Sequence, residues 1–404
     1  MLSFEEARQK VISVVRERGA RTAHDVVEIG RGFGRVLAEP ILADRDYPPF
    51  DRSTRDGFAV RSADVAKPGA SLELVGEIKA GDTFSGSLGP GQCVQIMTGA
   101  ALPPGADAVV MLEHSRAEGK RVLFERAGEP GQNVVPRGSE AREGQTLLEP
   151  GARMGYAELA LAAQVGKIRF DVFLRPRVAI LSTGDEVVAI DAQPGPFQIR
   201  NSNVLSLAAQ AALAGAEPLP LGNAPDHPGA LRVMIEQGLG ADILVLSGGV
   251  SVGKYDLVES VLRELGAEFF FDAVAIRPGR PAVFGICRNK FVFGLPGNPV
   301  STMVTFELLV VPAIDWLGGA EPRPLPLFKA RLAAPVHQKA ALTHFLPAKL
   351  TWTAGEPVVR ELPWQGSGDI VAVARAACFL VVRPEKLELA AGDWVDVLPR
   401  RGLF

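Results

Sequence analysis

Three apolar segments of the chain run directly into loops whose residue types could bind an anion. The loops combine glycine, hydroxyl, acidic and proline residues: Thr183, Gly184, Asp185 and Glu186 after RVAIL; Ser247, Gly248, Gly249, Ser251 and Gly253 after DILVL; and Pro296, Gly297, Asn298 and Pro299 after FVFGL. Glycine lets a backbone approach a ligand closely, and Ser and Thr hydroxyls bind phosphate or metal-bound oxygen. One Gly-rich turn is only a tight connection in about half of cases. Three in one part of the chain favour an anionic ligand.

Two arginines strengthen this interpretation. Arg277 and Arg280 lie in the sequence IRPGRP, directly after the apolar segment FFFDAVA. Guanidinium groups bind phosphate and other oxyanions through paired N–H groups. The alternative is a solvated basic turn, but the neighbouring loops favour a role in binding an oxyanion.

Carboxylates beside the same loops could hold Mg²⁺. Asp185, Glu186 and Asp256 are the nearest in sequence, and Mg²⁺ commonly takes one or two carboxylates together with substrate phosphate oxygens. A carboxylate at the start of a helix is also a common cap, so both roles stay open for Asp256. Asp226 in NAPDHP is most simply the N-cap of the following helix, and it is a further candidate metal ligand. None of the five histidines has a recognisable metal-binding spacing.

Polar loops in the first third of the chain are less informative when taken alone. PPFDRSTRDGFAV contains Asp56, IMTGAALPPGADAVV contains Thr98, and NVVPRGSE contains Arg137 and Glu140. Prolines and an Asp-Gly pair make such loops rigid and exposed, and Asp56 by itself is most simply a turn former.

The elements that position these residues follow from the hydrophobic pattern. Strand-like and helix-like segments alternate through residues 171–320, which predicts parallel βαβ units and a doubly wound α/β sheet. Ligands of such sheets bind at the carboxyl ends of the strands. All three glycine-rich loops are therefore expected at one edge of one sheet.

Three further units are expected. Short apolar runs at 47–140 predict a small inserted β domain, and strand-like runs at 321–404, after the linker EPRPLPLFK, predict a C-terminal β barrel or sandwich. Residues 1–46 and 141–170 contain helix-like segments at 4–18 and 155–165, which we expect to pack together as one discontinuous helical domain. Ser3 and Glu6 predict a capping box at the start of the first helix.

Bulk properties exclude several classes of protein. The 404 residues carry a formal charge of −3 with a pI near 6.1, which argues against nucleic acid or an anionic membrane as the main partner. The three cysteines form no CxxC pair, so neither a disulfide framework nor a cysteine zinc site is supported. The apolar stretch FELLVVPAIDWL is interrupted by Glu307, Pro312 and Asp315, short of the about 18 residues that span a membrane. We expect a soluble, cytoplasmic protein.

Eight loops in a fixed order carry a family resemblance over the whole chain. They are PPFDRSTRDGFAV, GEIKAGD, IMTGAALPPGADAVV, GQNVVPRGSE, LSTGDEVV, SGGVSVGKYD, IRPGRP and GLPGNPVS. Together they resemble the molybdopterin molybdenumtransferase family of MoeA-type molybdenum insertases, which is related to the gephyrin E domain. The resemblance implies a four-domain homodimer with a MogA-like α/β domain. It also implies Mg²⁺-dependent insertion of molybdenum from molybdate into adenylylated molybdopterin, with release of AMP.

The resemblance also assigns roles to individual positions. It implies that Asp56 and Thr98, with Arg137 and Glu140 nearby, face the active site from the partner subunit. Glu186 and Asp256 would hold Mg²⁺ or water, and Arg277 and Arg280 would bind molybdate or phosphate. The pterin-side phosphate would be cradled by Ser247, Gly248, Gly249 and Ser251. Pro296 and Pro299 would shape the pocket, and Ser367 in QGSGD is a further candidate from the last domain. Arginines replace the lysines of the usual KPGKP pattern, which keeps the charge but changes a point charge to a planar fork.

Two other functions are consistent with parts of this pattern. A molybdopterin adenylyltransferase would share the α/β domain and would consume ATP, but the additional β domains argue against it. A non-enzymatic scaffold or cofactor carrier would be expected to have lost its acidic positions, and these are present. Molybdopterin adenylyltransferase and acceptor molybdoenzymes are the expected partners.

Overall fold

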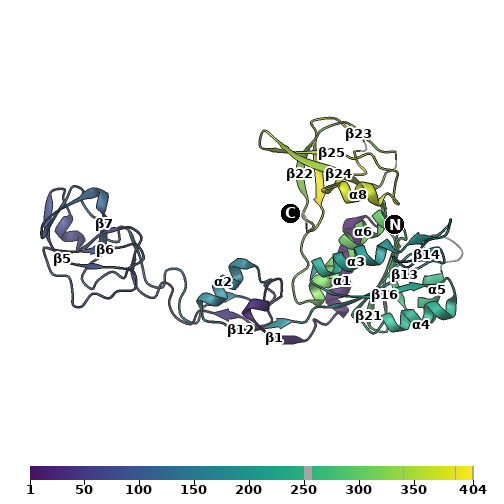
Figure 1. Ribbon diagram of the computed structural model, residues 1–404, viewed down its shortest axis with the longest axis horizontal. Coiled ribbons are helices and arrows are strands. Elements are labelled where there is room, and N and C mark those ends of the chain that lie inside the picture. The colour runs from purple at the N-terminus through teal and green to yellow at the C-terminus, as the bar shows by residue number, and fades with distance from the viewer. Residues whose placement is uncertain (250–256, 340, 387, 403–404) are drawn as a thin grey trace.

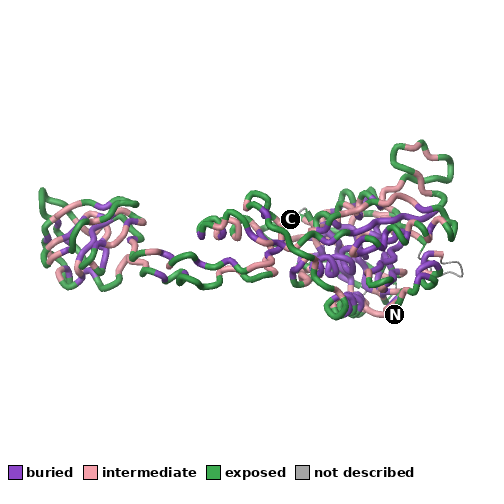
Figure 2. The backbone as a smooth tube through the Cα atoms, turned by 90° about the horizontal axis from the view of Figure 1, so that it is seen from below, coloured by how far each residue is buried: buried purple, intermediate pink, exposed green. Residues whose placement is uncertain are grey.

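The protein is an elongated chain of four parts. The computed structural model describes residues 1–249, 257–339, 341–386 and 388–402. A distal β domain lies at one end, a slender middle domain follows, and an α/β domain lies beside a C-terminal barrel at the other end (Figure 1). Buried residues are concentrated in the α/β end of the molecule, whereas two narrow, mostly exposed segments join the distal and middle domains (Figure 2). The predicted multidomain α/β plus β architecture is confirmed.

The distal domain is built on one six-stranded sheet with strand order β7-β4-β6-β5-β9-β8. The strands are β4 (Gly57–Val60), β5 (Ala70–Ile78), β6 (Gln92–Ile96), β7 (Ala108–Met111), β8 (Ser115–Glu118) and β9 (Arg121–Phe124), with 3-10 turns η2 (Ser62–Val65) and η3 (Leu112–His114). Apolar clusters around Phe58 and Ile78 form its core. At its neck, β3 (Arg52–Ser53) pairs antiparallel with β10 (Val134–Val135), which brings the entering and leaving chain together.

The middle domain contains more strand than helix. β1 (His24–Glu28) pairs with β12 (Arg169–Phe173), and β2 (Ile41–Leu42) pairs with β11 (Thr146–Leu148), all antiparallel. One 3-10 turn, η1 (Ile29–Arg31), and one helix, α2 (Tyr156–Gln164), complete it. Its small core includes Leu37, Met154 and Phe170, so segments on both sides of the distal domain form one unit.

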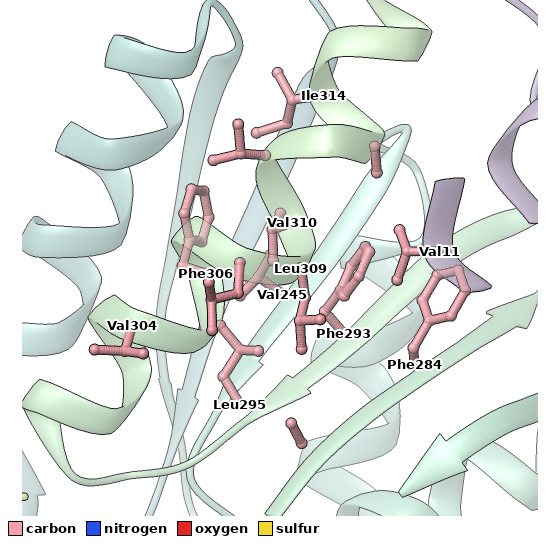
Figure 3. Close-up of a cluster of buried hydrophobic side chains, with 14 of the residues drawn as sticks. Val11, Val245, Phe284, Phe293, Leu295, Val304, Phe306, Leu309, Val310 and Ile314 are labelled. Atoms are coloured by element: carbon pink, nitrogen blue, oxygen red, sulfur yellow. The ribbon is translucent and has the colours of Figure 1, made fainter. Parts of the chain in front are cut away.

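The first helix does not belong to this middle unit. The capping box of α1 (Phe4–Arg18) is confirmed by reciprocal bonds between Ser3 and Glu6. The expected packing of α1 against the 155–165 helix is wrong, because α1 contacts α7 (Val311–Leu317) of the α/β domain. Figure 3 shows Val11 of α1 close to Phe284 and Phe293. The apolar stripe of α1 is more stable against a larger apolar surface, because more apolar area is then removed from water. α2 offers little such surface, since it buries only Ala162 of its own residues.

The α/β domain is a six-stranded sheet with order β16-β13-β17-β21-β20-β18. Its strands are β13 (Arg177–Thr183), β16 (Glu217–Ala224), β17 (Ile243–Ser247), β18 (Glu268–Ala273), β20 (Pro281–Cys287) and β21 (Lys290–Leu295). The first four in sheet order are parallel, and β20 and β18 form an antiparallel edge. Helices α3 (Ser202–Ala214), α4 (Pro228–Gly238) and α5 (Leu257–Glu264) and the short parallel pair β14 (Val187–Val188) and β15 (Ile199–Arg200) connect them. The doubly wound sheet is as predicted.

The register of the parallel strands aligns their carboxyl ends. Ser182 of β13 lies opposite Ser247 of β17, which in turn lies opposite Leu295 of β21. Each of the three glycine-rich loops begins at or directly after this row. The three loops therefore lie together at one edge of the sheet.

One long apolar helical segment, Pro299–Leu317, forms the centre of the main core. It comprises α6 (Pro299–Thr305), a π-helical stretch (Phe306–Val310) and α7. Among the described residues it is the one helix long and apolar enough to cross a membrane, but 89% of its apolar window is buried inside the fold. Phe306, Leu309 and Ile314 point into the cluster drawn in Figure 3, so the segment is a core helix.

The C-terminal domain is a closed barrel after the irregular linker 321–327. Its strands are β22 (Phe328–Leu332), β24 (Thr343–Thr353), β25 (Glu356–Glu361), β26 (Cys378–Val382) and β28 (Trp394–Pro399), and pairing of β24 with β26 closes it. The pair β23 (Val336–His337) and β27 (Glu388–Leu389) and helix α8 (Ile370–Arg375) are added to it. β19 (Ile276–Arg277), which belongs to the α/β domain in sequence, pairs with the edge of β24 and so ties the two domains together.

Candidate functional site

A cavity of about 420 Å³ lies at the aligned carboxyl ends of β13, β17 and β21. It is lined by residues of all three glycine-rich loops and by the start of α3: Ser182, Thr183, Gly184, Glu186, Val187, Ile199, Arg200, Asn201, Ser202, Asn203, Asp226, Ser247, Gly248, Gly249, Pro281, Pro296, Gly297, Asn298 and Pro299. The predicted meeting of the three loops is thus observed. Ser251, Gly253 and Asp256, together with Lys254, lie outside the described residues.

The glycines of the central loop bring its backbone against the neighbouring strand end. Gly248 has φ +95°, and a Cβ atom there would lie 2.7 Å from the carbonyl oxygen of Thr183. Gly249 has φ +66°, and its Cβ would lie 2.6 Å from a methyl group of Val258. Both the dihedral angle and the close contact exclude a larger side chain. Backbone atoms, and not side chains, therefore form this wall of the cavity.

Two carboxylates, Glu186 and Asp226, line the cavity. Asp185 does not line it, and its Oδ1 accepts a hydrogen bond of 3.0 Å from the backbone N–H of Asp226. Burial raises the pKa of Asp226, and the negative charges of Asp185 and Glu186 raise it further. Crowding of like charges of this kind is relieved by a bound cation.

The prediction that Asp226 caps the next helix is wrong. The N-cap of α4 is His227, whose Nδ1 accepts from the backbone N–H of Ala230 at 3.5 Å. His227 has the extended backbone of a cap residue and directly precedes Pro228 at the first helical position, so Asp226 lies one residue too early. Its carboxylate is thereby left at the cavity. Within the described ranges, no three His, Cys, Asp or Glu side chains converge as a metal site, so a cation here would rest on two carboxylates plus ligand oxygens.

Two asparagines at the start of α3 tie the loops together, and sequence reasoning missed both. Asn201 caps α3, accepting from Val204 N at 3.2 Å and from the hydroxyl of Ser182 at 3.1 Å. Asn203 donates from Nδ2 to the hydroxyl of Ser247 at 2.9 Å and to the carbonyl of Gly297 at 2.7 Å. The sequence RNSNV before an apolar-periodic helix carries the signal, because Asn and Ser favour N-cap positions.

Unpartnered buried atoms mark where a ligand would bind. Oγ1 of Thr183 and Oδ1 of Asn203 are buried and have no hydrogen-bond partner among the described residues, and both residues line the cavity. Buried polar groups without partners are rare in native proteins because each costs free energy. These two oxygens are therefore suited to accept hydrogen bonds from a bound molecule.

The two predicted arginines are not among the described residues that line the cavity. Arg277 and Arg280 are exposed, and neither forms an ion pair within the described part of the chain. The adjacent Pro281 does line the cavity. Arg277 is held in place by the pairing of β19 with β24, opposite His344. Arg280 directly precedes Pro281, which places it next in the chain to the cavity lining.

The C-terminal domain reaches the cavity rim through Ser367. Its hydroxyl accepts from Nδ2 of Asn298 at 2.9 Å, and its carbonyl accepts from Val300 N at 3.0 Å. Asn298 lines the cavity and precedes α6. The QGSGD loop therefore supports the third glycine-rich loop.

The remaining predicted residues gather in the distal domain and its neck. Oδ1 of Asp56 accepts from the backbone N–H of Thr98 at 2.7 Å and from its hydroxyl at 2.8 Å, and these bonds lower the pKa of Asp56. Arg137 bonds Asp46 at 2.8 Å, and Glu140 pairs with Arg52 at 2.7 Å. The distal domain lies at the far end of the subunit from the α/β domain (Figure 1). One subunit therefore does not bring these four residues to its own cavity.

Fold and site together define the class of protein: a multidomain protein with a doubly wound α/β sheet and a polar cavity at the carboxyl ends of its parallel strands. Three family models cover the chain, described as the MoeA N-terminal region (domain I and II) at residues 2–166, a probable molybdopterin binding domain at 179–316, and the MoeA C-terminal region (domain IV) at 329–399. The chain belongs to the molybdopterin molybdenumtransferase family of molybdenum cofactor biosynthesis.

Individual relatives match along most of their length. The molybdopterin molybdenumtransferase of Nostoc sp. is 39% identical over 79% of this chain and 75% of its own. That of Bacillus subtilis is 35% identical over 90% of this chain and 87% of its own. A crystal structure of a molybdopterin biosynthesis MoeA protein from Pyrococcus horikoshii OT3 superposes with a TM-score of 0.82 at 25% identity, covering 99% of this chain and all of that one. The four-part fold is therefore shared.

Proposed function

We propose that this transferase inserts molybdenum from molybdate into adenylylated molybdopterin, with release of AMP, in a Mg²⁺-dependent reaction in the cytoplasm. The observation that carries the proposal is the polar cavity at the strand ends. Gly248 and Gly249 line it, as do two residues with oxygens that are unpartnered among the described residues. A cavity of about 420 Å³ has the size of a small-molecule site. The nucleotide and the pterin-side phosphate would bind there.

The carboxylates at the cavity would bind the divalent cation. Glu186 and Asp226 lie together, and Asp256 would be added to them on the resemblance of the SGGVSVGKYD loop. Bound Mg²⁺ would neutralise charge on phosphate oxygens. The raised pKa of Asp226 supports this, since a cation stabilises the ionised forms of crowded carboxylates.

Molybdate would bind beside the cavity, held by Arg277, Arg280 and the QGSGD loop with Ser367. Paired N–H groups of arginine suit a tetrahedral oxyanion. The protein's own thiols do not take part in this proposal. Cys93, Cys287 and Cys378 are all buried, and burial raises the pKa of Cys93 and of Cys378 to about 12. The sulfurs that bind molybdenum would be those of the substrate dithiolene.

A homodimer would complete the site. Asp56 and Thr98 lie in the distal domain, and Arg137 and Glu140 lie in its neck, bonded to Asp46 and Arg52. Their participation therefore requires a second copy whose distal domain reaches this cavity. Molybdopterin adenylyltransferase would supply the substrate, and molybdoenzymes would receive the product.

The test is AMP release from adenylylated molybdopterin by purified protein, with and without molybdate and Mg²⁺. We expect AMP only when both are present, and a loss of at least about tenfold in an Asp56→Ala variant. Absence of AMP release would refute the proposal. ATP consumption with metal-free molybdopterin would instead support adenylyltransferase activity. A strictly monomeric active protein in light scattering would refute the shared site.

A further inference from the structure

The middle domain joins the α/β domain through two chain crossings that lie side by side. Residues 19–23 lead from α1 into β1, and residues 174–176 lead from β12 into β13. Leu174 N donates to the carbonyl of Ala23 at 2.7 Å, and Thr22 N donates to the carbonyl of Leu317 at 2.8 Å. Two adjacent crossings define a line, so they alone would allow the middle domain to rotate about it.

A charged contact beside these crossings joins the same two domains. Arg153 belongs to the middle domain, where its backbone bridges Val36 and its Nη1 donates to the carbonyl of Gly34 at 3.4 Å. Its Nη2 donates to Oδ1 of Asp315 in α7 at 3.1 Å. The Asp315 side chain is 0% exposed. The contact therefore adds a buried, charged bond between the two domains to the bonds made by the crossings.

The surfaces around Arg153 are closely packed. A Cβ atom on Gly215 would lie 3.0 Å from Nη1 of Arg153, and one on Gly319 would lie 2.0 Å from the ring of Phe173. The cavity at this seam measures about 10 Å³, which is room for no more than one water molecule. Gly215 ends α3 and Gly319 follows α7, so the arginine sits at two helix C-termini, where a positive charge is favoured.

Asp315 is held from the α/β side independently of Arg153. Arg323 donates to its Oδ2 from the backbone N–H and from Nε, both at 3.1 Å, and to its Oδ1 from Nη2 at 2.5 Å. The carbonyl of Arg323 in turn accepts from Arg8 of α1. Removal of Arg153 would therefore leave the buried carboxylate paired. The Arg153 contact can be tested without unfolding the core.

We propose that Arg153 is a positioning residue that, through Asp315, fixes the angle between the middle and α/β domains. The middle domain carries the distal domain, so this angle also sets the direction in which Asp56 and Thr98 are presented. The consequence for turnover rests on the function proposed above. The restraint that Arg153 places on the junction is independent of that function.

Hydrogen–deuterium exchange of the intact protein tests the restraint directly. In an Arg153→Gln variant, the amides of Thr22 and Leu174 should exchange at least about fivefold faster, because the two crossings open more often. Arg153→Lys should restore part of the protection. The control is Arg169→Gln, which removes an exposed ion pair to Glu28 within the same domain and should leave both amides unchanged. Unchanged exchange in Arg153→Gln, or an equal rise across the whole chain, would overturn the proposal.

Kinetics then separates positioning from substrate binding. Arg153→Gln should lower kcat by about five- to tenfold while the Kd for AMP, measured by calorimetry, stays at the wild-type value. Faster exchange with unchanged kcat would overturn the positioning role. If the wild-type protein releases no AMP from adenylylated molybdopterin, the proposed function fails, and the exchange experiment alone decides whether Arg153 restrains the junction.

Discussion

Asn203 is expected to hold two of the three cavity loops together, and its removal should be measurable in stability. An Asn203→Leu variant keeps the approximate shape but loses the bonds to Ser247 Oγ and Gly297 O. Each lost bond costs about 1 kcal/mol, so the free energy of unfolding should fall by about 2 kcal/mol. Ser247 is buried, which makes replacement of its partner by water unfavourable.

Urea denaturation of the α/β transition measures this change, and a double-mutant cycle assigns it. Ser206→Ala is the matched control, because it removes one local bond to the Asn203 carbonyl on the same helix and should cost less than about 1 kcal/mol. Combining Asn203→Leu with Ser247→Ala should give a coupling energy of about 1 kcal/mol. AMP binding should weaken in Asn203→Leu. A stability loss no larger than that of the control, with no coupling, would show that the loops are held without this side chain.

Three further outcomes follow from the site. Gly248→Ala should lower the free energy of unfolding by about 2 kcal/mol or more and abolish AMP binding, because a Cβ atom would lie 2.7 Å from the Thr183 carbonyl oxygen. The control is Gly266→Ala, also at positive φ but in open space. It should cost about 1 kcal/mol and leave AMP binding unchanged. The pKa of Asp226 is raised in the folded state, so ionisation of this carboxyl disfavours folding. The stability of the wild type relative to Asp226→Asn should therefore fall as the pH rises through that pKa. A Tm difference that changes in the opposite direction between about pH 4 and pH 7 would contradict this. The pKa of Asp56 is lowered in the folded state, so ionisation of this carboxyl favours folding. The stability advantage of the wild type over Asp56→Asn, measured as a Tm difference, should be present above the ordinary Asp pKa and lost as the pH falls below it. A Tm difference independent of pH would refute the bonds to Thr98.

The three cavity loops were predictable because their signals are local. An apolar run followed by Gly, Ser or Thr identifies a strand and its exit, and parallel strands in one sheet place their carboxyl ends together. The register of Ser182, Ser247 and Leu295 realises that geometry. The capping box of α1 was predictable for the same reason, since its two residues are three positions apart.

Other features depended on contacts between distant parts of the chain. The apolar stripe of α1 indicates a buried face but does not say which surface covers it, and the larger apolar surface of the α/β core does so. The sequence predicted Asp226 as the cap of α4, and the backbone at the helix start instead makes His227 the cap. The position of Arg277 depends on the pairing of β19 with β24 of the barrel, which is distant in the chain.

The sequence by itself determined the family, the α/β sheet and the set of loops that meet at its edge, because each rests on residue types at short spacing. Only the tertiary structure decided where the two halves of the proposed site lie. It set Asp56 and Thr98 at the opposite end of the subunit from Glu186 and Asp226. The distance between these groups depends on the junction at Arg153 and Asp315, which are 162 residues apart in the chain. A contact of that kind leaves no local pattern, because its free energy comes from burial and charge pairing that exist only in the folded protein.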